Sequence, residues 1–364
     1  MQDGYLTCTT RDGYFLQTTE MKLLIIGGTR FLGRHLVTVA LERDHEITLF
    51  NRGRHPFDAN VETIHGDRHT DIDKLRGRRW DVVVDTCGIL PSAVRSAAEV
   101  LSDSVDRYIF ISSQNAYADV STPGVTETAP LATLTSTQLE EVYSIDRSSE
   151  SSYGKWYGGL KALCEQTAEE VMPNRVLIIR PGLIVGPHDY TDRFTYWVAR
   201  IARGGEVLAP GRPDCFVQFI DVRDLAEWIV RMIERKETGA YYASSVPRTF
   251  TMKDVLEKCK AVSQSDASFT WASEEFLLQN GVAAWSEMPL WLPEEAAPHV
   301  RGFMFVSPEK AVRAGLNYRS LTETVGATLN WYQKDRHKLK AGLEPEKEEA
   351  LLRKLRSNDP ETSK

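Results

Sequence analysis

The sequence predicts an α/β fold: a doubly wound parallel sheet with a smaller C-terminal α+β lobe. From Met21 onward, short apolar runs alternate with amphipathic stretches, which is the rhythm of parallel strands joined by crossover helices. A glycine-rich turn joins the first apolar run to the first amphipathic stretch. Beyond Pro181 the rhythm loosens, and Gly, Pro and Trp gather in residues 204–213 and 285–298, as in a lobe whose long connections shape a pocket.

The first half of the chain carries the strands and helices of the predicted sheet. Strands are expected at Lys22–Ile26, Glu46–Phe50, Val61–His65, Asp81–Asp85, Arg107–Ser112 and Arg175–Arg180. Helices are expected at Phe31–Arg43, Pro91–Ser102 and about Tyr153–Met172. In the last of these, Tyr157, Leu160, Cys164, Ala168 and Val171 recur at helical spacing and mark a packed face.

Composition limits the class of protein. With 364 residues, 42% hydrophobic and 26% charged, the chain can bury a substantial core, which excludes a disordered protein. No run approaches the roughly 18 apolar residues of a membrane span, and the charged first twenty residues do not resemble a signal peptide, so we expect a cytoplasmic protein. The five cysteines form no C-x-x-C pair, which indicates reduced thiols. The net charge of -7 disfavours a nucleic-acid binder.

The glycine-rich turn has the position and spacing of a dinucleotide-binding loop. Backbone N–H groups and the dipole of the following helix can receive a pyrophosphate there. Glycines permit the tight turn and the close approach of backbone to ligand, whereas an ordinary strand-to-helix turn would not require them. The residues assigned to this loop are Gly27, Gly28, Thr29, Arg30, Phe31, Leu32 and Gly33.

The end of the second strand bears on the choice of cofactor. A carboxylate there would bond the ribose 2′-OH of NAD, but the chain reads Asn51-Arg52-Gly53-Arg54. Because a guanidinium suits a 2′-phosphate, NADP is favoured, with NAD as the alternative. Arg30 adds a second cation at the loop. Asp67, after the third strand, either contacts the adenine or caps the segment that follows it.

A second group of residues carries acid–base chemistry. Tyr157 and Lys161 stand four residues apart, hence one turn apart on the same helix face, and an ammonium near a phenol stabilises the phenolate. Ser113 follows the fifth strand at the carboxyl edge of the sheet, where ligands of open α/β folds bind. Ser113, Tyr157 and Lys161 are therefore the predicted catalytic residues.

These motifs resemble the extended short-chain dehydrogenase/reductase family, in its NAD-dependent epimerase/dehydratase group. The resemblance covers about residues 21–332 and includes Arg180-Pro181-Gly182-Leu183-Ile184-Val185-Gly186-Pro187 and Phe219-Ile220-Asp221-Val222-Arg223-Asp224-Leu225. It implies a Rossmann domain, Tyr157 as acid/base, Lys161 on the nicotinamide ribose and Ser113 on the substrate oxygen. Pro181 is assigned to the cofactor with the same segment.

This resemblance gives a domain division. Residues 1–20 are expected to be an N-terminal extension, and residues 21–186 the NAD(P)-binding Rossmann domain, with a return of the chain near residues 214–246. The substrate-binding lobe would comprise residues 187–213 and 247–340. A charged tail, residues 341–364, is expected to carry an exposed helix at about residues 346–356.

The chain departs from the family pattern at several positions. Arg30 replaces the usual middle glycine of the loop, and the connection from Ser113 to Tyr157 is long enough to suggest an inserted lid. Gln114-Asn115 stands where the dehydratases carry Asp-Glu, which disfavours sugar dehydration. Leu183, Ile184 and Val217 occupy positions where nucleotide-sugar enzymes commonly carry asparagine or arginine, which disfavours a sugar diphosphate substrate.

Three alternative functions are compatible with these motifs. The leading one is an NADP(H)-dependent oxidoreductase that moves hydride to or from a carbinol or carbonyl carbon of a small molecule. An NAD(P)-dependent epimerase of a sugar or related substrate would use the same three residues. A cofactor-binding regulator or RNA-associated protein is the third, because similar Gly-Gly-Thr-Arg-Phe loops occur in chloroplast stem-loop-binding relatives and residues 76–79 are basic. The expected partner is a small molecule, neither membrane nor nucleic acid, with a homodimer left open.

Two further groups of residues are candidates for binding. His65, Asp67, His69 and Asp71 alternate after a strand, but nothing supplies the open geometry of catalytic zinc, so no metal is expected. Trp271, Trp285 and Trp291 either wall an apolar pocket in the second lobe or belong to its core.

Overall fold

The computed structural model describes residues 20–145, 150–293, 295 and 297–357. The predicted N-terminal extension, except Glu20, and the last seven residues of the predicted tail lie outside the described residues. Within the part of the chain that the structure describes, no helix combines the length and the apolar character needed to cross a membrane.

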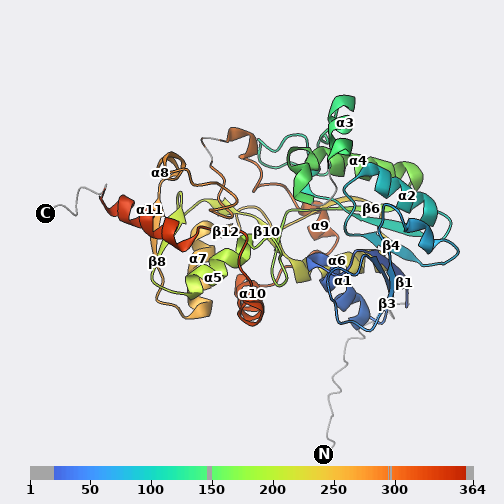
Figure 1. Cartoon of the computed structure of the whole chain (residues 1–364), viewed down its shortest axis with the longest axis horizontal. Coiled ribbons are helices and arrows are strands. Elements are labelled where there is room, and N and C mark those ends of the chain that lie inside the picture. The colour runs from blue at the N-terminus through green and yellow to red at the C-terminus, as the bar shows by residue number, and fades with distance from the viewer. Residues whose placement is uncertain (1–19, 146–149, 294, 296, 358–364) are drawn as a thin grey trace, which may run out of the picture.

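A parallel sheet of seven strands forms the larger half of the molecule (Figure 1). The order β11-β6-β5-β4-β1-β2-β3 reverses between β1 and β4, so the chain winds outward in both directions from the centre. The strands are β1 (Lys22–Ile26), β2 (Glu46–Asn51), β3 (Glu62–His65), β4 (Val82–Asp85), β5 (Arg107–Ile111), β6 (Val176–Pro181) and β11 (Gly239–Ala243). The six strands expected from the sequence are present, each within one residue of its predicted ends.

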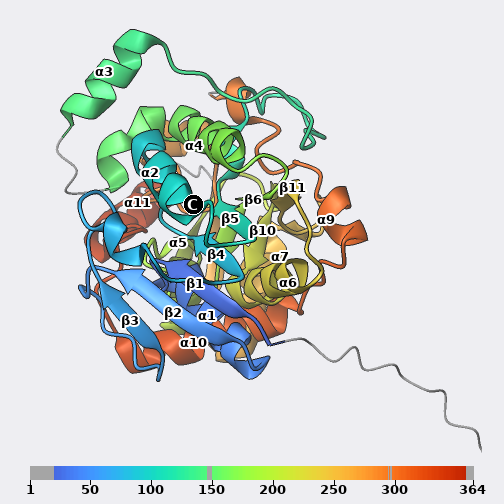
Figure 2. The same ribbon diagram turned by 90° about the vertical axis from the view of Figure 1, so that its right-hand side faces the viewer.

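Helices cover both faces of this sheet (Figure 2). One face packs against α1 (Phe31–Glu42) and α6 (Val222–Glu234), and the other against α2 (Pro91–Leu101) and α4 (Tyr157–Val171). In β1, Leu23 and Ile25 join the first core, whereas Leu24 joins the second. Because both faces are buried at the centre of the sheet, central strands such as β1 are rich in apolar residues. The predicted fold class is confirmed.

The remaining elements build a smaller lobe around a separate core. Its helices are α5 (Arg193–Ala202), α7 (Met252–Ser263), α8 (Glu274–Gln279), α10 (Leu321–Asp335) and α11 (Pro345–Ser357). Its strands pair two by two: β8 (Glu206–Pro210) with β13 (Ser268–Ala272), β9 (Phe216–Val217) with β12 (Phe250–Thr251), and β7 (Leu183–Val185) with β10 (Phe219–Asp221). The short helix α9 (Glu309–Arg313) brings Ala311 into the core on the α1/α6 face of the sheet.

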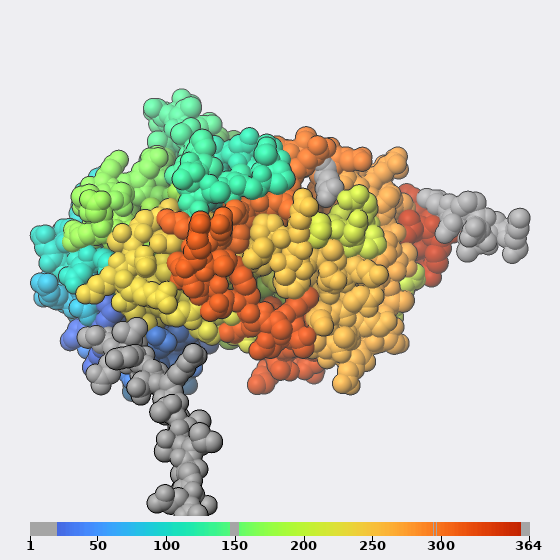
Figure 3. All heavy atoms as spheres, turned by 180° about the vertical axis from the view of Figure 1, so that it is seen from behind, coloured from blue at the N-terminus to red at the C-terminus, as the bar shows by residue number. Residues whose placement is uncertain are grey.

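The long connection between β5 and α4 has two parts with different environments. Residues 117–131 are tied to residues 302–307, since Gly302 N–H donates to the Val120 carbonyl (2.8 Å) and Gly124 N–H to the Phe305 carbonyl (2.9 Å). Figure 3 shows this teal-green segment beside the orange one. The second part carries α3 (Ser136–Ser144), capped by Thr135, which lies outermost over α2 and α4 in Figure 2. The connection in which we expect a lid thus consists of a strap, residues 117–131, followed by the helix α3.

Helix α4 begins later than the sequence predicts. It starts at Tyr157, and the preceding residues form a 3₁₀ segment, Glu150–Trp156, which is broken at Gly154 (φ 1°, ψ -90°). Glycine has no Cβ to hinder this conformation, so it separates the two segments. Tyr153 consequently does not share a helix with Tyr157, contrary to the predicted boundary.

The predicted tail helix exists, but its expected exposure is wrong for one face. In α11, Glu348, Leu351 and Leu352 are buried against the smaller lobe. The Glu348 carboxylate accepts a hydrogen bond from Arg200 Nε (2.6 Å) and another from Leu208 N–H (3.1 Å). Charge patterning alone could not reveal this, because the partner guanidinium comes from α5.

We predict that Glu348→Ala destabilises the fold strongly, because it leaves the Arg200 guanidinium buried without a counter-charge. Removing one partner of a buried pair costs about 3–5 kcal/mol in free energy of unfolding. Chemical denaturation would measure it. Glu349→Ala is the matched control, since its side chain is exposed beside Arg353 and should change the free energy by less than about 0.5 kcal/mol. Equal losses in the two variants would contradict a structural role for the buried pair.

Candidate active site

A cavity of ≈ 390 Å³ opens where the parallel strands end, which is within the size range of small-molecule sites. Its wall is formed by the turn after β1, the ends of β2 to β5, the start of α4 and the residues after β6. The structure brings every predicted site residue to this wall: Gly27, Gly28, Thr29, Arg30, Phe31, Leu32, Gly33, Asn51, Arg52, Asp67, Ser113, Tyr157, Lys161 and Pro181.

The glycine-rich turn needs its glycines for two physical reasons. Gly27 and Gly28 have φ angles of 101° and 81°, which side-chain-bearing residues rarely adopt. A Cβ on Gly33 would lie 2.7 Å from the Gly28 Cα, so α1 could not approach the turn with any other residue there. Arg30, by contrast, has an extended backbone (φ -130°) that does not require glycine. Its guanidinium carbon lies 4.0 Å from the centre of the Tyr190 ring.

The end of β2 presents donors and one nearby acid. Asn51 Oδ1 accepts a hydrogen bond from Gly53 N–H (2.8 Å), while its Nδ2 is buried without a partner among the described residues. Arg52 lies 3.8 Å from the Asp67 carboxylate. Asp67 also accepts from His69 N–H (2.9 Å), so it caps the local turn and faces the cavity at the same time. Both predicted roles of Asp67 remain compatible with this geometry.

Further basic residues lie near the end of β2. The sequence did not identify His55 or Lys340 among them. Arg54 and His55 line the wall, and slight burial together with Arg30, Arg52, Arg54 and Lys340 lowers the pKa of His55. Lys340 comes from the segment after α10, far away in sequence. No local pattern could have revealed it, because only the packing of the smaller lobe brings it here.

The three predicted catalytic residues come from two adjacent elements. Ser113 directly follows β5 and caps a short 3₁₀ turn, where its Oγ accepts from Asn115 N–H (3.2 Å). Tyr157 is the first residue of α4. Lys161 is buried, and its ammonium donates to the Gly88 carbonyl (2.9 Å) and the Ile111 carbonyl (2.6 Å). The Lys161 nitrogen lies 6.0 Å from the centre of the Tyr157 ring.

The two glycines between Tyr157 and Lys161 explain how these elements meet. A Cβ on Gly158 would lie 2.2 Å from the Asn115 carbonyl oxygen. A Cβ on Gly159 would lie 2.6 Å from the Leu134 side chain. Only glycine therefore allows α4 to pack this closely on the turn that carries Ser113.

A buried ion pair behind the site was missed by sequence reasoning. Arg180, at the end of β6, donates from Nε (3.0 Å) and Nη2 (2.7 Å) to the Glu165 carboxylate on α4. Ser112 Oγ donates to the same carboxylate, and Arg180 Nη1 donates to the Glu127 carbonyl (3.1 Å). Burial lowers the pKa of Arg180, but the hydrogen bond and charge of Glu165 outweigh this and raise it. An arginine at a strand end gave no signal of this partnership.

A second buried network fixes the residue after Ser113. The Tyr242 hydroxyl lies 3.0 Å from Gln114 Oε1 and 3.2 Å from Gln218 Oε1. The Gln218 amide nitrogen donates to the Ser245 carbonyl (2.7 Å) and the Val306 carbonyl (2.8 Å). Gln114 thus connects the Ser113 turn to β11 and to the smaller lobe.

Another buried pair lies on the cofactor side of the cavity. Arg68 donates through both terminal nitrogens to the Asp85 carboxylate (2.7 and 2.8 Å), which also accepts from the Tyr108 hydroxyl (2.6 Å). Burial raises the pKa of Asp85, but the Arg68 guanidinium outweighs this and holds it below its usual value. The carboxylate at the end of β4 is therefore neutralised and supports the wall.

The aspartates of the alternating His and Asp segment after β3 accept backbone hydrogen bonds within the local turn. Asp71 accepts from Asp67 N–H (2.8 Å), and Asp67 caps His69. Among the residues that the structure describes, no group of three or more His, Cys, Asp or Glu is placed to hold a metal ion.

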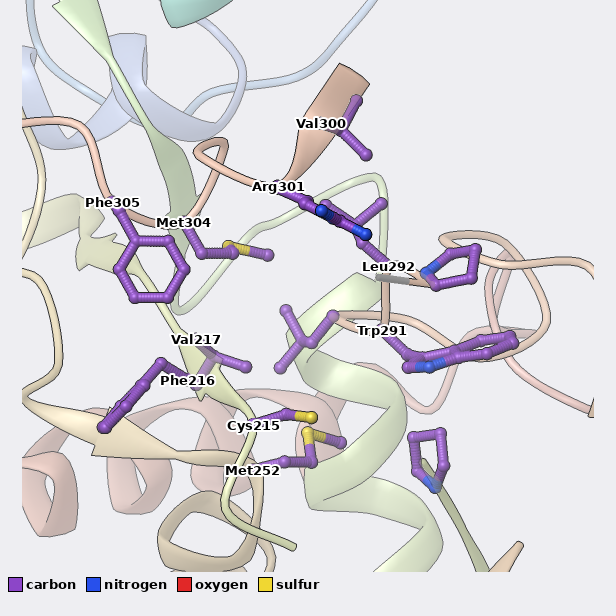
Figure 4. A pocket seen from close by; sticks show the side chains of 13 residues that line it. Cys215, Phe216, Val217, Met252, Trp291, Leu292, Val300, Arg301, Met304 and Phe305 are labelled. Carbon is purple, nitrogen blue, oxygen red and sulfur yellow. The ribbon is translucent and has the colours of Figure 1, made fainter. Parts of the chain in front are cut away.

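A smaller cavity of ≈ 40 Å³ lies within the smaller lobe (Figure 4). Sulfur-containing and apolar side chains form most of its described wall, among them Cys215, Val217, Met252 and Met304. Trp291 lines it, whereas Trp271 and Trp285 are absent from the wall, so the predicted tryptophan pocket is only partly correct. None of the predicted site residues lines this cavity, whereas all of them line the larger one.

Residues 90–243 match the model of the NAD dependent epimerase/dehydratase family. Among curated proteins, the "Chloroplast stem-loop binding protein of 41 kDa b, chloroplastic" of Arabidopsis thaliana is 32% identical over 123 residues, which are 29% of this chain and 32% of that protein. The match thus spans about a third of the relative's length. The expected resemblance to the NAD-dependent epimerase/dehydratase group is confirmed over residues 90–243.

Solved structures share the fold over most of the chain. The UDP-Glc/GlcNAc 4-epimerase of Campylobacter jejuni has a TM-score of 0.63 at 18% identity, covering 86% of this chain and 99% of that one. The Bordetella bronchiseptica enzyme WbmH, solved with NAD⁺, has a TM-score of 0.61 at 16% identity, with 87% and 99% covered. The UDP-glucose 4-epimerase of Thermotoga maritima, solved with UDP-glucose, has a TM-score of 0.61 at 15% identity. The match covers 87% of this chain and 100% of that one. At these identities the likeness establishes the fold.

Proposed function

Since residues 90–243 carry the pattern of the NAD dependent epimerase/dehydratase family, we propose that this chain is an NADP(H)-dependent oxidoreductase. It moves hydride to or from a carbinol or carbonyl carbon of a small molecule. The observation that carries the proposal is the position of Ser113, Tyr157 and Lys161 on one wall of the cavity that begins at the glycine-rich turn.

The residues present fit a nicotinamide dinucleotide. The turn after β1 offers backbone N–H groups at the start of α1, where a pyrophosphate is stabilised. The buried Asn51 Nδ2 provides an unpaired donor at the wall. When bound, the nicotinamide would accept or supply the hydride.

Tyr157 moves the proton at the substrate oxygen. In the reductive direction its hydroxyl gives a proton to the oxygen as negative charge develops there, and in the oxidative direction it takes the proton back. Lys161 favours the phenolate that remains, because its ammonium is held nearby by two carbonyls. Ser113 holds the same oxygen by a hydrogen bond. The Gly88 and Ile111 carbonyls keep Lys161 in place throughout.

NADP is the favoured cofactor on electrostatic grounds. Asp67 is the only carboxylate among the described residues that line the cavity, and it already lies near Arg52. A guanidinium recognises a phosphate through its planar set of donors. The end of β2 therefore suits a 2′-phosphate better than a free ribose hydroxyl.

The substrate is proposed to be small and to lack a sugar diphosphate. Val217 lies in the largely apolar wall of the second cavity, where the family resemblance would place an arginine in nucleotide-sugar enzymes. Ile184 lines the main cavity in place of a polar residue. We propose that the Rossmann half binds the cofactor and that the smaller lobe selects the substrate.

An epimerase is the second candidate, because several structurally similar proteins are named as UDP-sugar epimerases. The relative from Arabidopsis bears a stem-loop-binding name, but the basic residues 76–79 offer little support for a nucleic-acid site here. Arg76, Arg78 and Arg79 lie within 4.0 Å of Asp73, Glu62 and Asp106, respectively.

We predict steady consumption of NADPH in the presence of a carbonyl substrate. A screen of small aldehydes and ketones that follows the absorbance of NADPH would detect it, because net reduction consumes one cofactor for each turnover. An epimerase oxidises and re-reduces its substrate without net consumption of cofactor. Conversion of a substrate at constant NADPH would favour the second candidate.

We predict that NADPH binds more tightly than NADH and that Arg52→Ala reduces the preference. Losing a charge-assisted hydrogen bond to the phosphate should weaken NADPH binding about tenfold and leave NADH nearly unchanged. Calorimetric titration of both cofactors would measure this. Arg79→Ala serves as the control, since Arg79 is exposed and is not among the described lining residues. An unchanged preference in Arg52→Ala would contradict this role of Arg52.

We predict that Tyr157→Phe lowers turnover by ~10² or more, because the ring and its packing remain while the transferable proton is lost. Cofactor affinity should change little. Lys161→Met should reduce both turnover and cofactor affinity. Steady-state kinetics and cofactor titration separate these effects. Tyr153→Phe is the control, because Tyr153 also lines the cavity but lies before the break at Gly154. Wild-type turnover in Tyr157→Phe would rule out this acid.

A further inference from the structure

Two cations from distant segments meet around one aromatic ring that lines the cavity. Tyr190 lies in the loop between β7 and α5 and lines the cavity. The Arg30 guanidinium lies 4.0 Å from the centre of its ring, and the Lys340 ammonium 5.8 Å from the same centre. Phe31 contacts the ring edge-on at 6.3 Å. The turn after β1 and the segment after α10 thus share a contact through Tyr190.

The Lys340 segment is fastened to the loop that carries Tyr190. Lys340 N–H donates to the buried Asp192 carboxylate (3.0 Å), and the other oxygen of that carboxylate lies 2.8 Å from His337 Nε2. The second ring nitrogen of His337 lies 2.9 Å from the Asp335 carboxylate. Burial lowers the pKa of His337, but the two carboxylates outweigh this and raise it. The backbone of Lys340 is therefore fixed while its ammonium points back to Tyr190.

Close packing against α5 further restricts the backbone that follows Lys340. A Cβ on Gly342 would lie 1.9 Å from the Tyr196 ring, and Ala341 and Leu343 are buried beside it. The segment is thus packed on α5 directly after Lys340. Its position is a property of the folded lobe, and an incoming ligand need not order it.

Most of the cations near Tyr190 and the end of β2 have no carboxylate partner among the described residues. Of Arg30, Arg52, Arg54 and Lys340, only Arg52 has a carboxylate within 4.0 Å among the described residues. Burial lowers the pKa of His55, and the positive charges of all four residues lower it further. Like charges held near one another repel and favour an anion between them.

We propose that Lys340 completes a site for the 2′-phosphate of the cofactor, so that the smaller lobe takes part in choosing NADP over NAD. The proposal rests on the proposed NADP-dependent function. Arg52 and Arg54 follow β2, Arg30 lies in the glycine-rich turn, and Lys340 closes the set from the other half of the molecule. Lys340 is then a specificity-determining residue that is remote from the reacting atoms.

The test uses two probes that differ only in the phosphate of interest: adenosine 2′,5′-bisphosphate and 5′-AMP. Calorimetric titration is performed on the full chain and on three variants. Wild-type protein should bind the bisphosphate at least about tenfold more tightly. Lys340→Ala should weaken the affinity for the bisphosphate about tenfold and leave the affinity for 5′-AMP unchanged. Lys340→Arg should restore most of the affinity for the bisphosphate. Lys338→Ala should match the wild type, because Lys338 is exposed and lies 3.4 Å from Glu344.

The outcomes separate the two proposals. Equal binding of both probes by the wild type would overturn the NADP preference itself. A wild-type preference that Lys340→Ala retains would overturn only the role of Lys340. Equal weakening of both probes in Lys340→Ala would assign the lysine to the 5′-phosphate that they share or to the structure of the lobe, and it would overturn the specificity role. Inorganic phosphate is the third probe, and binding as tight as that of the bisphosphate would identify a free-phosphate site instead.

Discussion

The Glu165–Arg180 pair holds together the elements on which the site depends. Two charges removed from water must be compensated by good geometry and further hydrogen bonds. Here Glu165 also accepts from Ser112, and Arg180 also donates to the Glu127 carbonyl, so the pair links α4, β6, the end of β5 and the strap of residues 117–131. Tyr157 lies on the same helix as Glu165, and Ser113 follows Ser112. One buried cluster thus links the two elements that carry the proposed catalytic residues.

The same strap connects the two halves of the molecule. Its backbone pairs with residues 302–307, and the Glu127 carboxylate accepts from Tyr242 N–H (2.9 Å) on β11. Tyr242 in turn reaches Gln114 and Gln218. A change in how the smaller lobe packs would therefore be transmitted to the residues beside Ser113, through contacts that leave little room for independent movement.

The sequence predicted what local patterns encode. Apolar runs located the central strands because both faces of the sheet are covered, and the glycine turn was recognisable because its φ angles and close contacts demand glycine. The start of α4 was misplaced, since periodicity continues through Tyr153 while the backbone breaks at Gly154. The buried pairs of Glu165 and Glu348 and the approach of Lys340 depend on partners far away in sequence, which no local pattern contains.

The late start of α4 has an electrostatic consequence for Tyr157. The aligned peptide dipoles of a helix place partial positive charge at its first turn, and this region stabilises anions and disfavours cations. Tyr157 occupies the first position of α4, so the phenolate of the proposed mechanism would belong to a residue at the positive end of the helix. Lys161 stands one turn further in, at a poor location for a cation, and the Gly88 and Ile111 carbonyls offset that disadvantage. Peptide dipoles and a fixed ammonium then act together, and this concentration of positive potential exists before any ligand arrives.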